Sequence, residues 1–329
     1  MASLSLLAGV PPFLMARELL TRAGAFEPGM SPGPEPPPAL REAVRPLSEQ
    51  AIAAALLEQL RSAAFAIYGP DDRIEAYEVQ GAEQRRALDC TAAVFFDAAV
   101  QDAGDDARSL YTRPFGPMKQ LCPGVRFYNQ PSGATATGVL VGPDLVVTAA
   151  HVARRIPWQR MCLVFGFQME NPFAARERIP VGDVYRVAEL VARGDGGETP
   201  RDWALLRLDR RAEGRPFAAI NRDRPLAVGQ AIYPVGHPMG LPVKFAGNAR
   251  VLERGDDDIF TANLDVFPAC SGSPVFNAET HALEGIVLAD PTLDHFLPVD
   301  GCYVQATFPE EESVGNQHLR AHHFAGAVV

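Results

Sequence analysis

Phe267-Pro-Ala-Cys-Ser-Gly-Ser-Pro-Val-Phe276 is a stretch of small residues and prolines between two apolar runs. Serine and glycine contribute little buried area, so this composition is not that of a core segment. It is typical of a tight loop that presents one serine hydroxyl, that of Ser271, at a surface. A serine hydroxyl is a weak nucleophile at its free pKa and is activated by an adjacent base that a third group orients. The stretch therefore predicts that a histidine and a carboxylate from elsewhere in the chain meet Ser271.

Two upstream segments offer these groups. Leu145-Val-Val-Thr-Ala-Ala-His-Val152 ends an apolar strand in His151, and Arg201-Asp-Trp-Ala-Leu-Leu-Arg-Leu208 opens another strand with Asp202. An aspartate at the start of an apolar run lies at the edge of a buried strand. We therefore predict that Ser271 is the nucleophile, that His151 is the general base, and that Asp202 holds the imidazole tautomer.

Three other residues are alternative candidates for the acid or the nucleophile. Asp183 and Asp195 are weaker candidates for the acid, because neither opens an apolar run so cleanly. Cys270 is a candidate nucleophile, since thiolates are more reactive than hydroxyls near neutral pH.

The chain resembles the chymotrypsin-fold serine peptidases over roughly Leu121 to Phe308. The resemblance rests on Thr148-Ala-Ala-His151, Asp202-x-Ala-Leu-Leu206 and Ser271-Gly-Ser-Pro-Val275, which occur in the chain order of the chymotrypsin-type triad. Further phrasings are similar to the bacterial, glutamyl-endopeptidase-like branch, namely Gly138-Val-Leu-Val-Gly-Pro-Asp-Leu145, Gly236-His-Pro-Met-Gly-Leu-Pro242 and Ser271-Gly-Ser-Pro-Val-Phe-Asn277.

This resemblance implies a mostly β protein of two six-stranded antiparallel barrels that hydrolyses peptide bonds through an acyl-enzyme. It also implies that Cys270 points away from the site, because thiol enzymes on this fold carry Cys-Gly at the nucleophile and here Gly272 follows Ser271. The implied reaction needs no metal and no cofactor.

The resemblance also implies an oxyanion hole formed by the backbone N–H groups of Ala269 and Ser271. The family nearly always has Gly-Asn or Gly-Asp where this chain has Ala269-Cys270. Glycine adopts the required backbone conformation at less cost than alanine. We therefore expect that the hole could stay unformed until substrate or a partner binds. Cys270 also removes the carboxylate that pairs with a new N-terminus in trypsin-like zymogens, so activation by that route is not expected.

Substrate-binding residues follow from the same resemblance. Asp265 lies six residues before Ser271, at the base of the primary pocket in trypsin-like enzymes, which would favour cleavage after Arg or Lys. In many bacterial relatives an aspartate here serves structure instead, so this alternative stays open. Glutamate specificity is less expected, because valines replace the histidine and threonine that read it. The predicted substrate-binding residues are Asp265, Val266, Val287, Leu288, Ala289, Asp290, Gly301 and Tyr303.

Composition limits the remaining possibilities. The net charge of −10 argues against a nucleic-acid binder that relies on phosphate contacts. No apolar run is long enough for a membrane span. Five scattered cysteines do not form a disulfide framework, so buried or free thiols are expected. Together with the lack of a basic segment before the apolar start of the chain, this favours a cytoplasmic location over secretion.

The chain is expected to have four regions. Residues 1–47 are apolar and then Pro-rich, a linker; 48–118 form a helical extension; 119–308 form the peptidase domain, with the barrel junction near 209–226; and 309–329 form a tail. The predicted strands are 125–129, 136–141, 144–149, 161–167, 184–192, 203–208, 230–235, 247–253, 258–264, 274–277, 282–289 and 301–306. His237 is expected in a turn, and His318, His322 and His323 are expected in the solvated tail rather than at a metal.

The extension leaves three functional alternatives open. It could pack against its own protein, act as a pro-segment, or bind a regulatory protein through residues 1–118. Accordingly, the chain is predicted to be a serine endopeptidase acting on proteins or peptides. The alternatives are a protease that is latent until a partner or processing activates it, and a catalytically silent module that grips peptide strands on the same fold.

Overall fold

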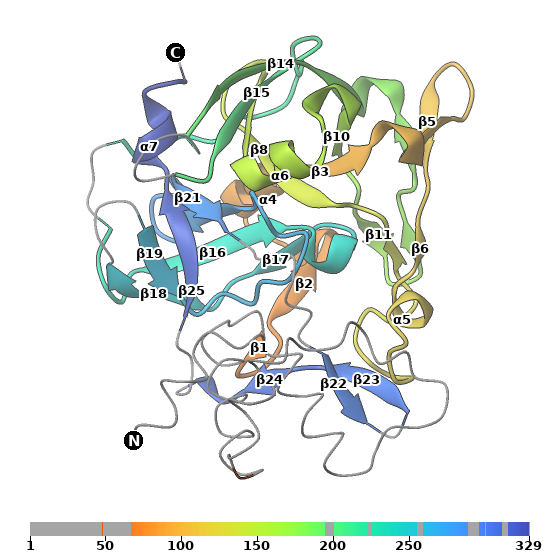
Figure 1. Cartoon of the computed structure of the whole chain (residues 1–329), viewed down its shortest axis with the longest axis vertical. Helices are drawn as coiled ribbons and strands as arrows, with labels where there is room; N and C mark the ends of the chain where they lie inside the picture. Colours follow the sequence, from red (N-terminus) through yellow and green to blue (C-terminus); the bar gives the residue numbers. More distant parts are fainter. Residues whose placement is uncertain are drawn as a thin grey trace. The chain divides into compact units, whose positions relative to one another are not determined.

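The computed structural model describes residue 48 and residues 67–194, 201–222, 226–254, 259–288, 296–299, 301–310 and 315–328. The chain divides into two units, 1–64 and 65–329, and the fold below is that of the second (Figure 1). The helical and linker predictions for residues 1–66 lie outside the described residues, apart from Ser48.

The first barrel is closed and has six antiparallel strands. Around the barrel they follow the order β10 (Met161–Phe165), β14 (Val184–Arg193), β15 (Ala204–Leu208), β9 (Leu145–Thr148), β8 (Ala136–Leu140) and β3 (Thr91–Phe96). Every residue of β8, β9 and β10 is buried, because one face fills the barrel and the other is covered by neighbouring segments. These strands therefore appear in the sequence as continuous apolar runs rather than as alternating ones.

The second barrel also closes with six antiparallel strands. Their order is β18 (Ala249–Arg254), β19 (Ile259–Ala262), β25 (Asn316–Arg320), β21 (Leu283–Val287), β20 (Pro274–Asn277) and β16 (Ala231–Gly236), and β16 pairs back to β18. Its interior is an apolar cluster that includes Ile232, Val251, Phe260, Val275 and Val287. The two six-stranded antiparallel barrels predicted from the sequence are thus confirmed.

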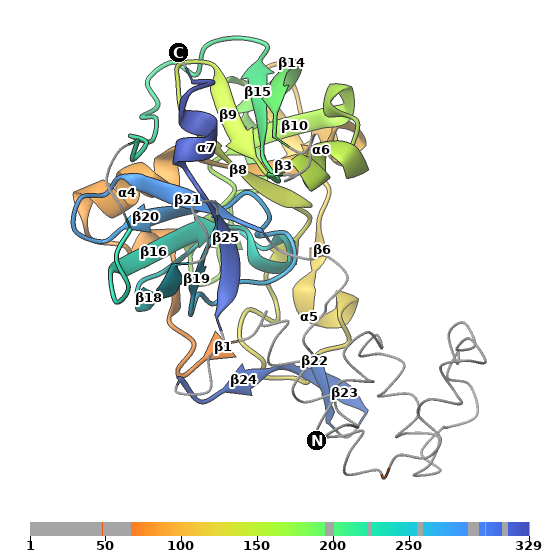
Figure 2. The same cartoon turned by 60° about the vertical axis from the view of Figure 1, so that its left-hand side comes forward.

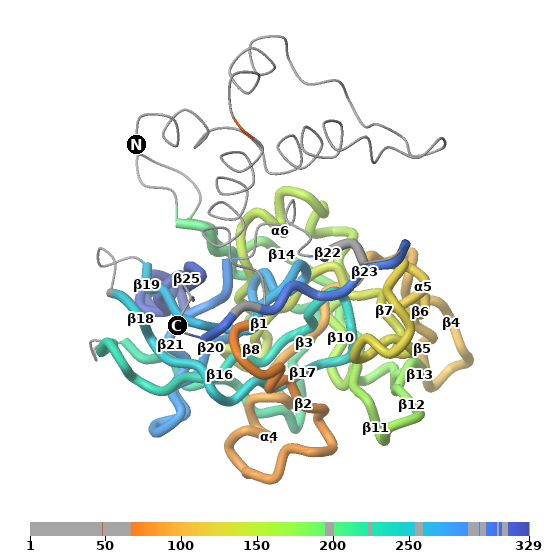
Figure 3. The backbone as a smooth tube through the Cα atoms, turned by 90° about the horizontal axis from the view of Figure 1, so that it is seen from below, coloured from red at the N-terminus to blue at the C-terminus, as the bar shows by residue number. Residues whose placement is uncertain are grey.

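Two further strands extend the second barrel from β16. They are β17 (Lys244–Ala246) and β2 (Arg73–Glu75), which lie side by side in Figure 3. A buried ion pair joins them, with Lys244 Nζ 2.9 Å from Glu75 Oε2. A segment that precedes the first barrel in the chain is therefore part of the second barrel's sheet.

Short elements surround the barrels. The remaining strands are β1 (Ile67–Tyr68), β4 (Val100–Asp102), β5 (Ala107–Leu110), β6 (Arg113–Pro114), β7 (Pro131–Ser132), β11 (Met169–Asn171), β12 (Ala174–Ala175), β13 (Arg178–Pro180), β22 (Phe296–Val299), β23 (Cys302–Gln305) and β24 (Thr307–Phe308). The described α-helices are α4 (Ala82–Asp89), α5 (Phe115–Met118), α6 (Ala150–Arg155) and α7 (His322–Ala325). Short 3₁₀ turns occupy Ala76–Glu78, Asp97–Ala99, Trp158–Arg160, Val181–Asp183 and Pro238–Gly240. Helix α7 lies against the first barrel, where the Phe324 ring is 6.3 Å from the ring of Trp203 (Figure 2).

The region boundaries predicted from the sequence are wrong at both ends of the peptidase domain. Residues 67–118, expected to belong to a helical extension, contain several strands, and one of them, β3, belongs to the first barrel. Residues 309–329, expected to be a tail, contain β25 of the second barrel and α7. Conversely, 125–129 forms turns and 301–306 belongs to a hairpin outside the barrels.

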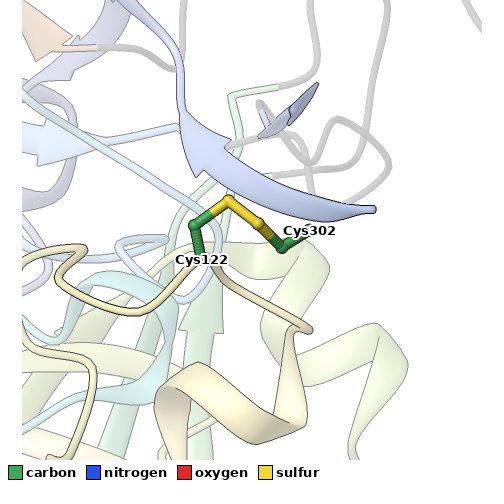
Figure 4. The surroundings of a disulfide bond; sticks show 2 residues. All are labelled: Cys122 and Cys302. Carbon is green, nitrogen blue, oxygen red and sulfur yellow. A yellow bond between two sulfur atoms is a disulfide. The ribbon is translucent and has the colours of Figure 1, made fainter. Parts of the chain in front are cut away.

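The expectation of free thiols is wrong for two of the five cysteines. Cys122 and Cys302 form a disulfide across a sequence separation of 180 residues (Figure 4). Cys90, Cys162 and Cys270 are free and buried. The cytoplasmic expectation rested partly on missing disulfides, so that part of its support is removed. No helix in the described ranges is long and apolar enough to cross a bilayer.

Candidate active site

Three side chains predicted from the sequence meet between the two barrels. His151 Nδ1 lies 2.5 Å from Asp202 Oδ2, and His151 Nε2 lies 2.7 Å from Ser271 Oγ. The backbone N–H of His151 also donates to Asp202 Oδ1 at 2.7 Å. The imidazole is therefore held between a carboxylate and a hydroxyl, which is the arrangement needed to take a proton from the serine.

Strand pairing in the first barrel places the histidine and the aspartate. Thr148 at the end of β9 pairs with Ala204 at the start of β15. His151 follows Thr148 by three residues and Asp202 precedes Ala204 by two. Because the strands are antiparallel, both residues leave the sheet at the same end. His151 then lies in the first turn of α6, which fixes its direction.

The electrostatics of Asp202 favour the charged carboxylate. Burial alone would raise its pKa, but hydrogen bonds from the ring and backbone of His151, with the charge of Arg154 3.7 Å away, outweigh this and lower the pKa below its ordinary value. An ionised Asp202 accepts the proton on Nδ1, which leaves Nε2 as the acceptor facing Ser271.

The loop before Ser271 has the backbone shape for which the family uses glycine. Ala269 has φ +70°, in the left-handed region that costs an alanine about 1–2 kcal/mol. Its carbonyl accepts a hydrogen bond from Thr137 Oγ1 at 3.0 Å, while its N–H donates to no acceptor in the described part of the chain. The expectation that alanine could keep the hole unformed is therefore not met in the backbone of Ala269, because the left-handed conformation is present without substrate or partner.

The other side of the serine is anchored to both barrels. Thr137 N–H donates to the Ser271 carbonyl at 3.0 Å, and Gly272 N–H donates to the Val287 carbonyl at 2.9 Å. Gly272 has φ +82°, and a Cβ there would lie 2.3 Å from the Thr137 carbonyl oxygen. Only glycine fits this position, so the nucleophile loop is tightly constrained.

The rival assignments are not supported by the geometry. Cys270 is buried in the apolar core of the second barrel, and burial raises its pKa to about 11, so the thiol stays neutral. Asp183 forms an ion pair with Arg215 at 2.5 Å, and its carboxylate has no contact with His151 among the described interactions. Asp195 lies outside the described residues.

Asp265 is present where the sequence predicted it but is committed to the protein's own backbone. Its Oδ1 accepts the Tyr68 N–H at 2.9 Å, and burial raises the carboxyl pKa to about 8. It lines a cavity of only about 10 Å³ together with two cationic residues, Arg73 and Lys244. Such a cavity holds about one water molecule.

The other predicted substrate-binding residues lie in different places. Val266 and Val287 are buried in one apolar cluster, and Leu288 follows Val287 at the end of β21. Gly301 and Tyr303 belong to the β22–β23 hairpin outside the barrels, and their role in substrate binding stays a prediction. Ala289 and Asp290 lie outside the described residues.

The residue opposite Val287 in the barrel is His318, which the sequence placed in a solvated tail. It is fully buried, its Nε2 lies 2.5 Å from Asn316 Oδ1, and burial lowers its pKa to about 3. His322 and His323 are partly buried in α7. His237 is in a turn as expected, and it is buried. Within the described ranges no three side chains are grouped as metal ligands.

The chain is similar to one family model and to a solved structure. Residues 136–286 match a family model described as a trypsin-like peptidase domain. A solved structure titled as a Glu endopeptidase in complex with MPD is 16% identical, with a TM-score of 0.47, and the match covers 80% of this chain and 96% of that one. No curated protein matches the chain.

Proposed function

Since residues 136–286 form a trypsin-like peptidase domain, we propose that the chain is a serine endopeptidase with Ser271, His151 and Asp202 as its catalytic residues. The observation that carries this proposal is the continuous contact of the three side chains, with 2.7 Å from hydroxyl to imidazole and 2.5 Å from imidazole to carboxylate.

The reaction is acyl transfer in two halves. Ser271 Oγ attacks the scissile carbonyl carbon as its proton passes to His151 Nε2, and the C–N bond then breaks as the imidazolium returns that proton to the leaving amine. Water attacks the resulting ester with His151 again as the base, and the acid is released as the serine regains its proton. Asp202 stays ionised throughout and stabilises the imidazolium.

The oxyanion is expected to bind the backbone N–H groups of Ala269 and Ser271. The Ala269 N–H supports this role, because it donates to no acceptor among the described residues and is therefore available to an oxyanion without first breaking a hydrogen bond.

Cleavage after Arg or Lys is not part of the proposal. A carboxylate pocket for a basic side chain needs an open space and an ionised acid. Asp265 instead accepts a backbone hydrogen bond, has a pKa raised to about 8, and shares its small cavity with Arg73 and Lys244. These observations favour the structural role that the sequence left open for this aspartate.

Processing of the N-terminal extension is also limited by the fold. Residues 67–75 carry β1 and β2, and the Tyr68 N–H binds Asp265 below the nucleophile loop. If the extension is a pro-segment, we propose that cleavage occurs before Ile67. N-terminal sequencing of an active, trimmed protein should find no start beyond that residue, and an active form that begins after Glu75 would contradict the assignment.

A fluorophosphonate probe tests the function directly. The wild-type chain and the control Cys270→Ala should be labelled, whereas Ser271→Ala should not. Asp202→Asn should lower kcat on a peptide substrate about 10⁴-fold with little change in KM. Absence of labelling in the wild-type chain would favour the silent peptide-binding module. Labelling that persists in Ser271→Ala would overturn the nucleophile assignment.

A further inference from the structure

A second, larger cavity adjoins the nucleophile loop. It encloses about 540 Å³, and Pro268, Ala269, Met239 and Thr135 form part of its wall. A smaller cavity of about 120 Å³ contains Ser271 itself and shares Ala269, Thr135 and Arg155 with the large one. The large cavity has the size of ligand-binding pockets, and the three shared residues connect its wall with that of the cavity at Ser271.

The position of the cavity assigns it to the leaving-group side of the substrate. The shared residue Arg155 lies on α6, the helix that carries His151, and His151 must protonate the leaving amine. Asp265, Val266 and Val287, which the sequence predicts on the acyl side of the substrate, do not line the large cavity. The substrate chain after the cleaved bond would therefore enter it.

The charged residues that line the cavity are all cationic. They are Arg113, Lys119 and Arg155, and no aspartate or glutamate of the described ranges lines it. Arg113 and Arg155 are exposed and form no ion pair with any described residue. The Lys119 Nζ lies 5.9 Å from the ring of Phe296. Glu177 accepts a hydrogen bond from the lining residue Thr112, but it is not itself part of the wall.

We propose that this cavity selects a substrate with a carboxylate side chain at one of the first residues after the cleaved bond, bound by Arg113 and Arg155 with Lys119 nearby. This inference rests on the proposed function of the same site and adds the class of its substrate. Arginine is well suited to such a role, because its guanidinium stays charged and can bind a carboxylate through two hydrogen bonds.

The expected size follows from the exposure of the cations. One exposed ion pair changes affinity about 1.5- to 5-fold, so the pairs of Arg113 and Arg155 together change it about 2- to 25-fold, and we expect a preference in kcat/KM of about 5- to 20-fold within this range. Because exposed charges are screened, the preference should fall towards unity as the ionic strength rises from 20 mM to about 1 M.

The test uses two peptides that are identical up to the cleaved bond and carry Asp-Glu or Asn-Gln after it. The wild-type chain should cleave the acidic peptide about 5- to 20-fold faster. The double variant Arg113→Glu, Arg155→Glu should lose or reverse that ratio. Arg86→Glu is the matched control, since it changes an exposed arginine of α4 and should keep the ratio. A ratio between two substrates of one protein is insensitive to any fraction that fails to fold.

A binding measurement separates this inference from the proposed function. Fluorescent peptides that represent only the leaving group, acidic or amidated, are titrated into Ser271→Ala, which needs no turnover. Tighter binding of the acidic peptide, lost on adding Arg113→Glu and Arg155→Glu, supports the inference even if the probe labels nothing. Equal binding of both peptides, or an equal loss in Arg86→Glu, overturns it even if Ser271 is labelled.

Discussion

Replacing Ala269 by glycine should stabilise the protein while leaving catalysis nearly unchanged. An alanine with φ +70° costs about 1–2 kcal/mol relative to a glycine in the same conformation. Glycine gives back about 0.4–1 kcal/mol through the greater entropy of the unfolded chain. The Ala269 methyl group lies at a partly exposed wall of two cavities, so little packing is lost. The free energy of unfolding should therefore rise by about 0.5–1.5 kcal/mol.

The assay is urea unfolding of Ser271→Ala proteins with and without Ala269→Gly, which avoids self-digestion. In thermal unfolding of the same proteins, a gain of 1 kcal/mol would raise the Tm by about 2–4 °C. Gln120→Gly is a matched control, because Gln120 is exposed with φ +53°. It should gain a similar amount. Ala269→Val should lose stability, since a β-branched residue tolerates this conformation poorly.

Kinetics give the refuting result. Because the backbone of Ala269 already has the left-handed shape, kcat/KM of Ala269→Gly should stay within about threefold of the wild type, far below the factor of 10²–10³ that one oxyanion donor supplies. A rise of that larger size would mean that alanine holds the oxyanion hole closed. A fall in stability would mean that Ala269 is not left-handed at all.

Three further outcomes are expected. Cys122→Ser with Cys302→Ser should lose about 2–5 kcal/mol in urea unfolding, because the disulfide closes a loop across 180 residues of separation; a wild-type midpoint unchanged by reductant would contradict this. Asp265→Asn should be more stable than the wild type by an amount that rises from about 1 kcal/mol at about pH 5 to about 4 kcal/mol at about pH 7. The native carboxyl, with its pKa raised to about 8, keeps a proton that the unfolded state has lost, so wild-type stability falls as pH rises, and parallel pH profiles would refute this reading. Lys244→Met alone should lower the free energy of unfolding by about 3–5 kcal/mol, because it leaves Glu75 charged and buried. Adding Glu75→Leu should restore most of this loss, and a failure to restore it would contradict a buried pair.

The three residues of the proposed active site could be selected from the sequence because each lies in a short local motif. His151 and Asp202 each adjoin an apolar strand, and Ser271 lies in a turn of small residues. Most barrel strands were predictable for the same reason, since their β-branched runs are separated by glycine and proline.

Two barrel strands were missed because local composition misrepresents them. In β3, Thr91-Ala-Ala-Val-Phe-Phe96, alanines suggest a helix and burial of both faces removes the alternation. In β25, Asn316-Gln-His-Leu-Arg320 appears polar, although Asn316 and His318 are buried and hydrogen-bonded to each other.

The contacts of the N-terminal segment could not be predicted from one sequence. Arg73 and Glu75 are charged residues of the kind usually found at a surface. Both are buried and bind polar partners, Gln305 and Lys244. These partners lie 232 and 169 positions away along the chain, so no local pattern indicates them. The disulfide between Cys122 and Cys302 is a long-range contact of the same kind.

The order of the strands in the chain determines when the second barrel can close during synthesis. Strand β25, Asn316–Arg320, bridges β19 and β21, and without it the second barrel stays open. A chain still on the ribosome completes its first barrel with β15 but lacks this bridge until nearly all strands have been translated. The second barrel, which carries Ser271, therefore closes only after Arg320 has been translated, so the proposed active site is completed late in synthesis.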